Sequence, residues 1–479
     1  MAVRLFGSAL VAVGIALAGL PGPATASPAP DTFARADGFV RDQMRRSSVP
    51  GLAYAIVEDG VVVHQGGFGV DGNGAAVTAD TPFLWGSVAK PVAATVTVEL
   101  ARQGVLRLDD PVRAHLPEFD LADRKSAAGI TIRDLLQHTS GLPFGAPLLD
   151  RADAGRRPAD VLPALASITP QSAPGTEHLY SSLNYLVLAA VIEAATRRPY
   201  PEVLTATVGR PLRMDGLVAT AAQAAKVPRG HRFVAGRPVR MSTGYDPAGA
   251  AYGYLGGSLT DLTRFAAAQL RPADPASTAQ LHAPGTRTGP GEHYGLGWRI
   301  DDLPDRAKSV WHSGTVPGYF STVILLPDTG RAVIMLQNVS GFFHESALLA
   351  TAQGVAGLLA DEEPSAVAVD PMYVPTVGVL AALALTLVVV LVMAVVRHRS
   401  PCRAPVGRRR LGAAAWVVAA AAFIAAATWG IRIAFDVPPR YLWLWAPDLA
   451  VLSWAIAGLA VAIAALRVRR AAGPGVTLS

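Results

Sequence analysis

Long, predominantly apolar runs of residues dominate the last quarter of the chain. Each of three such runs is about as long as a helix that crosses the hydrocarbon core of a bilayer, about 20 residues. They cover 374–396, 411–430 and 447–466. The pattern therefore predicts three transmembrane helices. The segment 361–373, rich in acids and prolines, is interpreted as the linker that precedes them, and 471–479 as a tail.

A shorter apolar run, 5–20, lies at the N-terminus behind Arg4. The triplet Ala-Thr-Ala at 24–26 follows it and has the small residues of a signal-peptide cleavage site. The pattern predicts a secretory signal over 1–26 and an exported region over 27–360. A retained N-terminal anchor is the alternative interpretation.

Arginine is distributed unevenly around the three apolar runs. Six arginines lie between the first and second runs and three follow the third, whereas the connection between the second and third holds two. Because positive residues accumulate on the cytoplasmic side of membrane helices, the first connection of the 374–470 region and the tail are predicted to be cytoplasmic. Everything before this region is then extracytoplasmic. Tyr441, Trp443 and Trp445 fit an outer interfacial belt.

Two β-hairpins are predicted between the signal and the linker, each with apolar segments on both sides of a turn. They pair 52–57 with 61–66 and 319–326 with 331–337. A further strand is expected through 294–298. These segments stand near the two ends of the exported region.

Helical patterns occupy most of the chain between the hairpins. The expected helices start after Gly86, cover 131–137 and 184–197, start again after Ser258, and end with a closing helix over 345–359. Asp261, three positions after Ser258, resembles the partner in a capping box. The arrangement predicts an α+β fold, with an antiparallel sheet flanked by helices and a helical subdomain.

Composition and charge refine this picture. The chain is 51% hydrophobic with a formal net charge of +6, yet the exported region 27–360 holds 30 basic and 30 acidic residues. The basic excess therefore reflects membrane topology and gives no support to nucleic-acid binding. The single cysteine, Cys402, falls in the predicted cytoplasmic loop, so no disulfide is expected in the exported region.

Lys90, one of only four lysines among 42 basic residues, lies three positions after Ser87. If a helix starts at Gly86, the two side chains lie one turn apart on the same face. A desolvated lysine can accept the hydroxyl proton of a serine, and a helix N-terminus can stabilise an oxyanion. The spacing thus suggests a nucleophile and its base. The same four-residue pattern also occurs on exposed helices without any chemical role.

Two further polar segments follow in order: Tyr-Ser-Ser at 180–182, before an apolar helix, and His-Ser-Gly-Thr at 312–315, in a strand. Together with Ser87-x-x-Lys90 they resemble the serine β-lactamase and penicillin-binding protein superfamily, in its class C β-lactamase, D-alanyl-D-alanine carboxypeptidase and esterase branch. The resemblance covers about 32–359.

The resemblance implies a role for several residues. Ser87 would be the acylated nucleophile, and Lys90 would accept or tune its proton. Tyr180 would move a proton to the leaving group and activate the deacylating water, provided that cations such as Lys90 lower its pKa. The backbone N–H groups of Ser87 and Thr315 would form the oxyanion hole.

Two positions depart from the superfamily pattern. Ser182 stands where asparagine is usual, and a hydroxyl makes fewer hydrogen bonds than an amide; Asn184 is interpreted as a helix N-cap and not as a replacement. His312, followed by Ser313 and Gly314, stands in the place of Lys-Thr-Gly and supplies less positive charge at neutral pH. Both changes favour ester hydrolysis over efficient β-lactam hydrolysis.

No metal or other cofactor is expected. His138 is interpreted as part of a structural turn, and His178 has no metal-type partner at regular spacing. The chain has no H-E-x-x-H, C-x-x-C or nucleotide-binding glycine motif.

The combined prediction is a multi-pass protein of the cell membrane with an extracytoplasmic serine hydrolase region. It would act through an acyl-enzyme on an amide or ester, such as a cell-wall D-amino-acid peptide, a β-lactam or a small ester. Its expected partners are this substrate and the lipid bilayer. The alternative hypothesis is a penicillin-binding sensor, in which Ser87 is acylated without efficient turnover and the membrane helices report occupancy.

Overall fold

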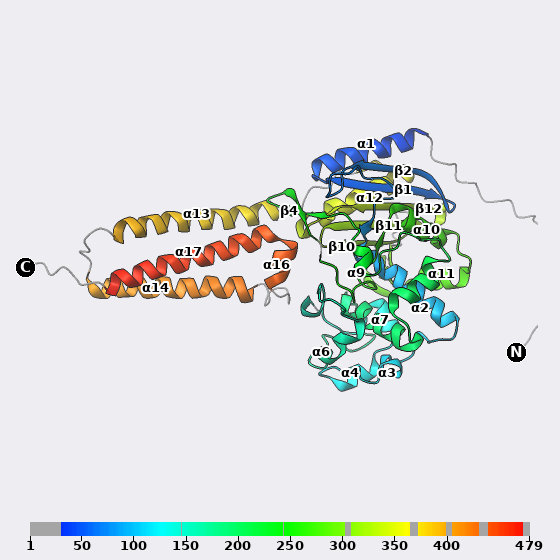
Figure 1. Cartoon of the computed structure of the whole chain (residues 1–479), viewed down its shortest axis with the longest axis horizontal. Coiled ribbons are helices and arrows are strands. Elements are labelled where there is room, and N and C mark those ends of the chain that lie inside the picture. Colours follow the sequence, from blue (N-terminus) through cyan, green and yellow to red (C-terminus); the bar gives the residue numbers. More distant parts are fainter. Residues whose placement is uncertain are drawn as a thin grey trace, which may run out of the picture.

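A computed structural model describes residues 30–472, apart from 145, 243, 302–307, 365–371, 399–404 and 431–438. The predicted signal over 1–26, Cys402 and most of the predicted linker lie outside the described residues. Figure 1 shows a body of sheet and helices from which three long helices extend to the side.

An eight-stranded antiparallel sheet forms the centre of the body, in the order β2-β1-β12-β11-β10-β9-β8-β7. Its strands are β1 (Gly51–Glu58), β2 (Val61–Gly69), β7 (Thr286–Gly289), β8 (Glu292–Tyr294), β9 (Arg299–Asp301), β10 (Ser309–Val316), β11 (Tyr319–Leu326) and β12 (Arg331–Gln337). Both predicted hairpins are confirmed, as β1–β2 and β11–β12. They join where β1 pairs with β12, which brings the two ends of the body together.

The strand expected through 294–298 is wrong. β8 ends at Tyr294 and β9 begins at Arg299, and the residues between them form a tight turn. The turn is closed by a hydrogen bond from the Gly295 N–H to the Trp298 carbonyl (2.8 Å), and Gly297 has a φ of +78°. Because glycine adopts this left-handed conformation without strain, the apolar run turns here instead of continuing.

Helices cover both faces of the sheet. Helices α1 (Pro30–Arg46) and α12 (Glu345–Leu359) lie on one face, as Figure 1 shows, and α2 (Ala89–Arg102) and α10 (Leu259–Leu270) belong to the other side. Alternate residues of β1 divide between two apolar cores: Leu52, Tyr54 and Ile56 face α1 and α12, and the residues between them face the larger core. The predicted closing helix over 345–359 is confirmed.

The helical subdomain lies between β3 (Phe83–Leu84) and β6 (Gly256–Gly257), which pair with each other. Its helices are α3 (Val112–His115), α4 (Arg124–Gly129), α5 (Ile132–Gln137), α6 (Leu162–Leu165), α7 (Ser182–Thr196), α8 (Tyr200–Leu204) and α9 (Ala221–Ala224). Helix α11 (Pro275–Leu281) follows α10. The α+β prediction is therefore confirmed. The expected helix 184–197 begins two residues earlier than predicted, as α7.

A small three-stranded sheet lies at the junction with the long helices. It is formed by β4 (Gly230–Val234), β5 (Arg237–Met241) and β13 (Val339–Ser340), with β13 parallel to β4. Figure 1 shows β4 close to the start of α13.

The three predicted membrane segments are confirmed as long apolar helices: α13 (Tyr373–His398), α14 (Val406–Ala425) and α17 (Pro447–Ala472), with the short α16 (Pro439–Trp445) before α17. Their length and apolar composition suit membrane spans. Where α14 and α17 meet, Ala420, Ala460 and Ala464 form the contact. Small residues of this kind let membrane helices approach closely.

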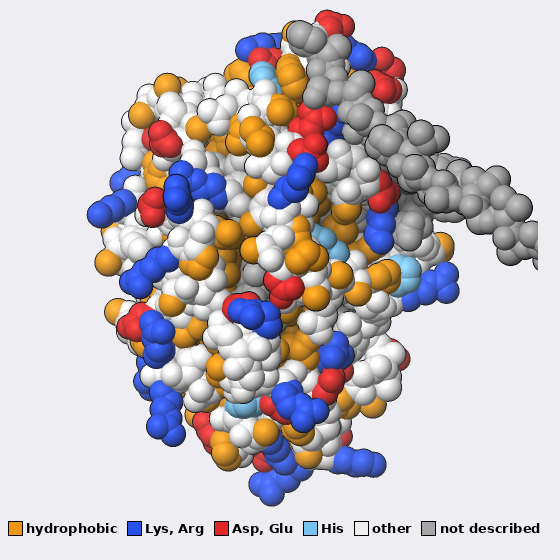
Figure 2. Space-filling model, turned by 90° about the vertical axis from the view of Figure 1, so that its right-hand side faces the viewer, with side chains coloured by type: hydrophobic (Ala, Val, Ile, Leu, Met, Phe, Trp, Pro, Cys, Tyr) orange, Lys and Arg blue, Asp and Glu red, His pale blue; other side chains and the backbone are white. Residues whose placement is uncertain are grey.

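Figure 2 shows the end of the body that faces away from the long helices. Lysine, arginine, aspartate and glutamate side chains are mixed over this face. The mixture agrees with the equal numbers of basic and acidic residues over 27–360.

Candidate active site

Ser87 lies in a short 3-10 turn, Gly86–Val88, between β3 and α2. This turn packs against β10. Two glycines permit this approach. A Cβ on Gly86, whose φ is +54°, would lie 2.5 Å from the backbone nitrogen of Thr315, and a Cβ on Gly314 would lie 2.5 Å from the backbone nitrogen of Ser87. Real Cβ atoms do not come so close to backbone atoms. The two glycines therefore bring strand β10 against the turn that carries Ser87.

Lys90, in the first turn of α2, is completely buried. Its Nζ lies 2.8 Å from Ser87 Oγ, 3.1 Å from Ser182 Oγ and 2.8 Å from the backbone carbonyl oxygen of Tyr252. Burial holds the pKa of the Lys90 amine well below its usual value; the Asp150 carboxylate opposes this shift, and Arg299 adds to it. The structure thus joins the first two predicted motifs in one hydrogen-bonded cluster.

Tyr180 lies beside this cluster, with Lys90 Nζ 5.0 Å from the centre of its ring. The condition that nearby cations bring its pKa down toward the working range is not met. Burial raises the pKa of Tyr180 to about 12, against the smaller lowering effects of a hydrogen bond with Ser87 and of the Arg299 charge. Desolvation of the phenolate thus outweighs the favourable charges.

Asn184 is not a helix N-cap. Ser181 caps α7, because its side chain accepts from the Leu183 N–H. Asn184 is the third residue of the helix and fully buried, where it accepts a hydrogen bond from Ser140 Oγ (2.5 Å) and lies 2.9 Å from His138 Nδ1. The interior position of the side chain excludes it from capping.

His138 packs against Tyr180. It ends α5 with a φ of +57°, and its ring centre lies 4.3 Å from that of Tyr180. Burial holds the pKa of His138 well below its usual value. These contacts agree with the structural role predicted for it.

His312 is buried in β10. Its Nδ1 lies 2.6 Å from the Ser313 carbonyl oxygen, so Nδ1 carries the ring proton and Nε2 accepts from the Tyr294 hydroxyl at 3.0 Å. Burial, followed by the charges of Arg299 and Lys90, holds the pKa of His312 well below its usual value. The ring is therefore neutral near pH 7, and this agrees with the weak positive charge expected from sequence.

Arg299 is a cavity-lining residue that sequence reasoning missed. It begins β9, pairs in register with Trp311 of β10, and lies 5.7 Å from the ring centre of Tyr180. Within the described part of the chain it makes no ion pair, and it stacks on aromatic rings instead. Burial lowers the pKa of both Lys90 and His312, whereas the Arg299 guanidinium carries a permanent positive charge.

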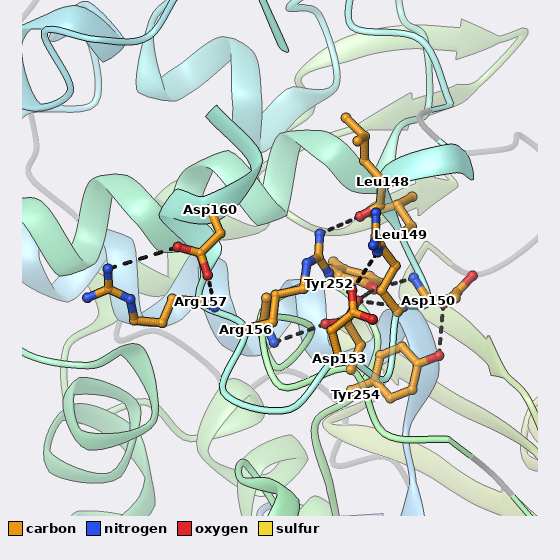
Figure 3. Close-up of polar contacts among 12 residues, drawn as sticks. Leu148, Leu149, Asp150, Asp153, Arg156, Arg157, Asp160, Tyr252 and Tyr254 are labelled. Atoms are coloured by element: carbon orange, nitrogen blue, oxygen red, sulfur yellow. Dashed lines mark hydrogen bonds and ion pairs between the residues drawn. The ribbon is translucent and has the colours of Figure 1, made fainter. Parts of the chain in front are cut away.

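A polar network stabilises the segments that contain Asp150 and Tyr252. Figure 3 shows Asp150 and Arg156 close to Tyr252 and Tyr254. Arg156 forms a buried ion pair with Asp246 (2.6 Å), which also accepts from the Tyr252 hydroxyl (2.7 Å). Asp150 accepts from the Tyr254 hydroxyl (3.0 Å), and burial raises its pKa. The network fixes the turn whose Tyr252 carbonyl binds Lys90.

A cavity of about 560 Å³ opens beside these residues. Its polar lining includes residues from every predicted motif: Ser87, Tyr180, Ser182, His312, Ser313 and Thr315. Gly314 does not line it and acts in the packing described above. Among the described residues, no cluster of three or more His, Cys, Asp and Glu side chains could hold a metal ion.

The chain combines an antiparallel sheet and a helical subdomain with a serine that is hydrogen-bonded to a buried lysine beside a cavity. These features define a serine hydrolase of the S-x-x-K type. The family model described as Beta-lactamase matches residues 36–357. The chain belongs to this family.

Relatives and solved structures agree with this assignment. The chain is 30% identical over 311 residues to penicillin-binding protein 4 of Amycolatopsis lactamdurans, covering 60% of this chain and 81% of that protein. It is 26% identical over 320 residues to the protein Flp of Staphylococcus aureus, covering 65% of this chain and 64% of Flp. The chain therefore spans slightly less than two thirds of the length of this staphylococcal relative.

The fold resembles that of a D-alanine carboxypeptidase, AmpC of Burkholderia cenocepacia, with a TM-score of 0.58 and 22% identity over 68% of this chain and 99% of that one. It also resembles EstCE1, a hydrolase with promiscuous acyltransferase activity, with a TM-score of 0.59 and 20% identity over 69% of this chain and 98% of that one. At these identities the likeness concerns the fold.

Proposed function

We propose that this chain is a membrane-anchored, extracytoplasmic hydrolase in which Ser87 forms an acyl-enzyme with an ester or amide substrate. The observation that carries the proposal is the contact of 2.8 Å between Ser87 Oγ and the buried Nζ of Lys90, whose pKa is lowered by burial. A lysine that is neutral near the working pH can act as a general base.

The surroundings of Lys90 support its role as proton acceptor. A neutral amine has two N–H donors and one lone pair. The Tyr252 carbonyl oxygen can only accept, and Ser182 Oγ takes a second hydrogen. The lone pair is then left for the hydroxyl proton of Ser87.

The proposed reaction has two steps. Ser87 Oγ bonds to the substrate carbonyl carbon as its proton passes to Lys90, and the backbone N–H groups of Ser87 and Thr315 stabilise the oxyanion. The bond from that carbon to the leaving oxygen or nitrogen breaks, and the leaving group takes up the proton. The oxygen of a water molecule then bonds to the acyl carbon, the bond from that carbon to Ser87 Oγ breaks, and a proton of the water passes to Ser87 Oγ as the acid is released.

Tyr180 has a narrower role in this proposal than sequence suggested. With a pKa of about 12 the phenol remains protonated near neutral pH. It can therefore donate a hydrogen bond to the departing atom, and the basic function falls to Lys90.

The lining of the cavity favours an ester with a negatively charged group nearby. Arg299 can bind such a group, since its guanidinium makes no ion pair within the described chain. Ser182, which contacts Lys90, offers less to a substrate amide than asparagine would. The activities named for structural relatives, D-alanine carboxypeptidase and D-stereospecific amidohydrolase, keep peptide-type substrates within the proposal.

The test uses the full chain in nanodiscs, supplied with a chromogenic ester, a fluorescent penicillin and a D-Ala-D-Ala peptide. We expect turnover of at least one substrate, and a decrease of at least about 10²-fold in Ser87→Ala and in Lys90→Met. Lys226→Met, which changes an exposed lysine in the same way, is the matched control and should retain full activity.

Each outcome decides between hypotheses. Turnover that persists unchanged in Ser87→Ala would contradict the whole proposal. Stoichiometric labelling of Ser87 with no product release would instead support the sensor hypothesis. Equal loss in Lys226→Met and Lys90→Met would show that the lysine effect is not specific to the site.

A further inference from the structure

The cavity beside Ser87 continues onto the membrane region. Besides the residues of the hydrolase body, it is lined by Leu380 of α13, by residues of α16, and by Leu449 and Ser453 of α17. The α16 contribution is Tyr441, Leu442 and Trp445. The long helices are therefore part of the wall of the active site and do more than tether it.

Specific hydrogen bonds hold α16 on the cavity wall. The Tyr441 hydroxyl donates to Asp150 Oδ2 at 2.6 Å, and the Arg440 guanidinium donates to the Pro147 and Leu149 carbonyl oxygens at 3.0 Å each. The ring of Phe144 lies edge-on to Tyr441, with centres 6.2 Å apart. These contacts place α16 directly over the loop that carries Asp150.

A second set of contacts joins the long helices to the turn between β4 and β5. The Gly236 N–H donates to the Tyr373 hydroxyl at 2.9 Å, and the Ala235 N–H donates to Asp448 Oδ2 at 3.2 Å. Tyr373 also donates to Asp448. The first turns of α13 and α17 are thus held together and against the turn between β4 and β5.

The two parts of the cavity lining differ in chemical character. The hydrolase body contributes the polar or charged side chains of Ser87, Tyr180 and Arg299. The lining from the long helices is mostly apolar. Leu380 lies seven residues after the first residue of α13, and Ser453 lies six residues after the first residue of α17. At 1.5 Å per residue this is about 10 Å from the first residue of each helix, within helices that are long and apolar enough to span a bilayer.

We propose that the substrate is an amphiphile, with its ester or amide at Ser87 and a hydrocarbon chain that lies along α13, α16 and α17 towards the bilayer. This inference rests on the function proposed above and on these helices spanning a membrane. A small polar substrate would gain nothing from an apolar wall built by membrane helices. The same arrangement gives the three helices a use that a simple anchor would not require.

A series of substrates with increasing chain length tests the inference in the full chain in nanodiscs. One series consists of p-nitrophenyl esters from acetyl to dodecanoyl, and the other of n-alkyl acetates from ethyl to decyl. Burial of each CH₂ contributes about 0.8 kcal/mol, so kcat/KM should rise by up to about fourfold per methylene in at least one series, until the cavity is filled.

Long substrates also partition into the lipid, which can raise the measured rate without any contact in the cavity. Two tryptophan variants, one a test and one its control, separate the two effects. Ser453→Trp places a ring in the cavity, and we expect the ratio of kcat/KM for octanoyl over acetyl ester to fall at least tenfold. Val451→Trp adds the same ring two residues away, at a side chain that is 52% exposed and does not line the cavity. This control should keep both the basal activity and the ratio of the parent.

The outcomes separate the inference from the function on which it rests. If hydrolysis does not depend on Ser87, the proposed function fails. If it depends on Ser87 but neither series rises with chain length, the inference alone is overturned. Equal ratios in Ser453→Trp and Val451→Trp would overturn it as well, because a ratio within one preparation does not depend on the fraction of folded protein.

Discussion

Two charged residues act on Lys90 in opposite directions. The Asp150 carboxylate favours the protonated amine and raises the pKa of Lys90, whereas the Arg299 guanidinium lowers it. As a base, Lys90 must be neutral, so kcat/KM should rise with pH through its pKa. Asp150→Asn should therefore move the acid limb of the pH profile to lower pH, and Arg299→Gln should move it to higher pH.

The pH profile of kcat/KM for a neutral ester, measured with each variant, checks this prediction, because it reports ionisation of the free enzyme. A neutral ester is chosen so that loss of a binding charge does not distort the comparison. Shifts in the same direction would show that the acid limb does not belong to Lys90.

Gly314 tests how closely β10 must approach Ser87. An added Cβ would overlap the Trp85 carbonyl oxygen and lie 2.5 Å from the Ser87 nitrogen. Gly314→Ala should therefore displace the turn and reduce activity by at least about 10²-fold, because misplacement of about 1 Å has effects of this size. The same change at Gly38 in α1, where a Cβ meets nothing within 4 Å, is the control. Activity of Gly314→Ala near the parental level would contradict the proposed packing.

At the scale of elements, the capping box that begins α10 is confirmed. Ser258 Oγ donates to Asp261 Oδ2 at 2.6 Å and accepts from the Asp261 N–H at 3.1 Å. Ser258→Ala removes both bonds and should lower the free energy of unfolding by about 1 kcal/mol. Thermal unfolding of the full chain in detergent measures this loss. Ser258→Thr keeps the cap and should retain most of the stability; equal losses in the two variants would contradict the assignment.

Other elements show how far local patterns reach. The segments 319–326, 331–337 and 345–359 were predicted with the bounds that the structure has, because each is a run of one periodicity closed by a turn or a polar residue. The segment 294–298 has the same apolar character and is a turn, since Gly297 adopts a positive φ. The periodicity of apolar residues alone does not show that the chain turns at this glycine.

At the scale of the whole molecule, the predicted orientation can be tested with the only native cysteine. Cys402 should lie in the cytoplasm, and an impermeant maleimide should leave it unlabelled in intact cells. Asp215→Cys in a Cys402→Ser background introduces a thiol at a side chain that is 89% exposed on the hydrolase body, and it should be labelled from outside. Permeabilised cells should label both proteins. Labelling of Cys402 in intact cells would contradict the topology.

Some residues of the candidate site could be assigned from the sequence, and others only from the structure. Ser87 and Lys90 could be paired from sequence because one helical turn separates them. Arg299 could not be assigned to the site, since its place depends on the register of β9 with β10. Sequence does not reveal the pKa of Tyr180 for a related reason: burial, which raises this pKa, results from packing of the whole domain.

The sequence by itself determined the two hairpins, the three apolar helices, the α+β class and the pairing of Ser87 with Lys90, because these depend on neighbours within one turn, one hairpin or one run of residues. Only the tertiary structure showed that Tyr441 binds Asp150, 291 positions earlier, and that α13, α16 and α17 line the active-site cavity. Contacts across such separations depend on how complete elements pack, and no local pattern of hydrophobic and polar residues contains that information.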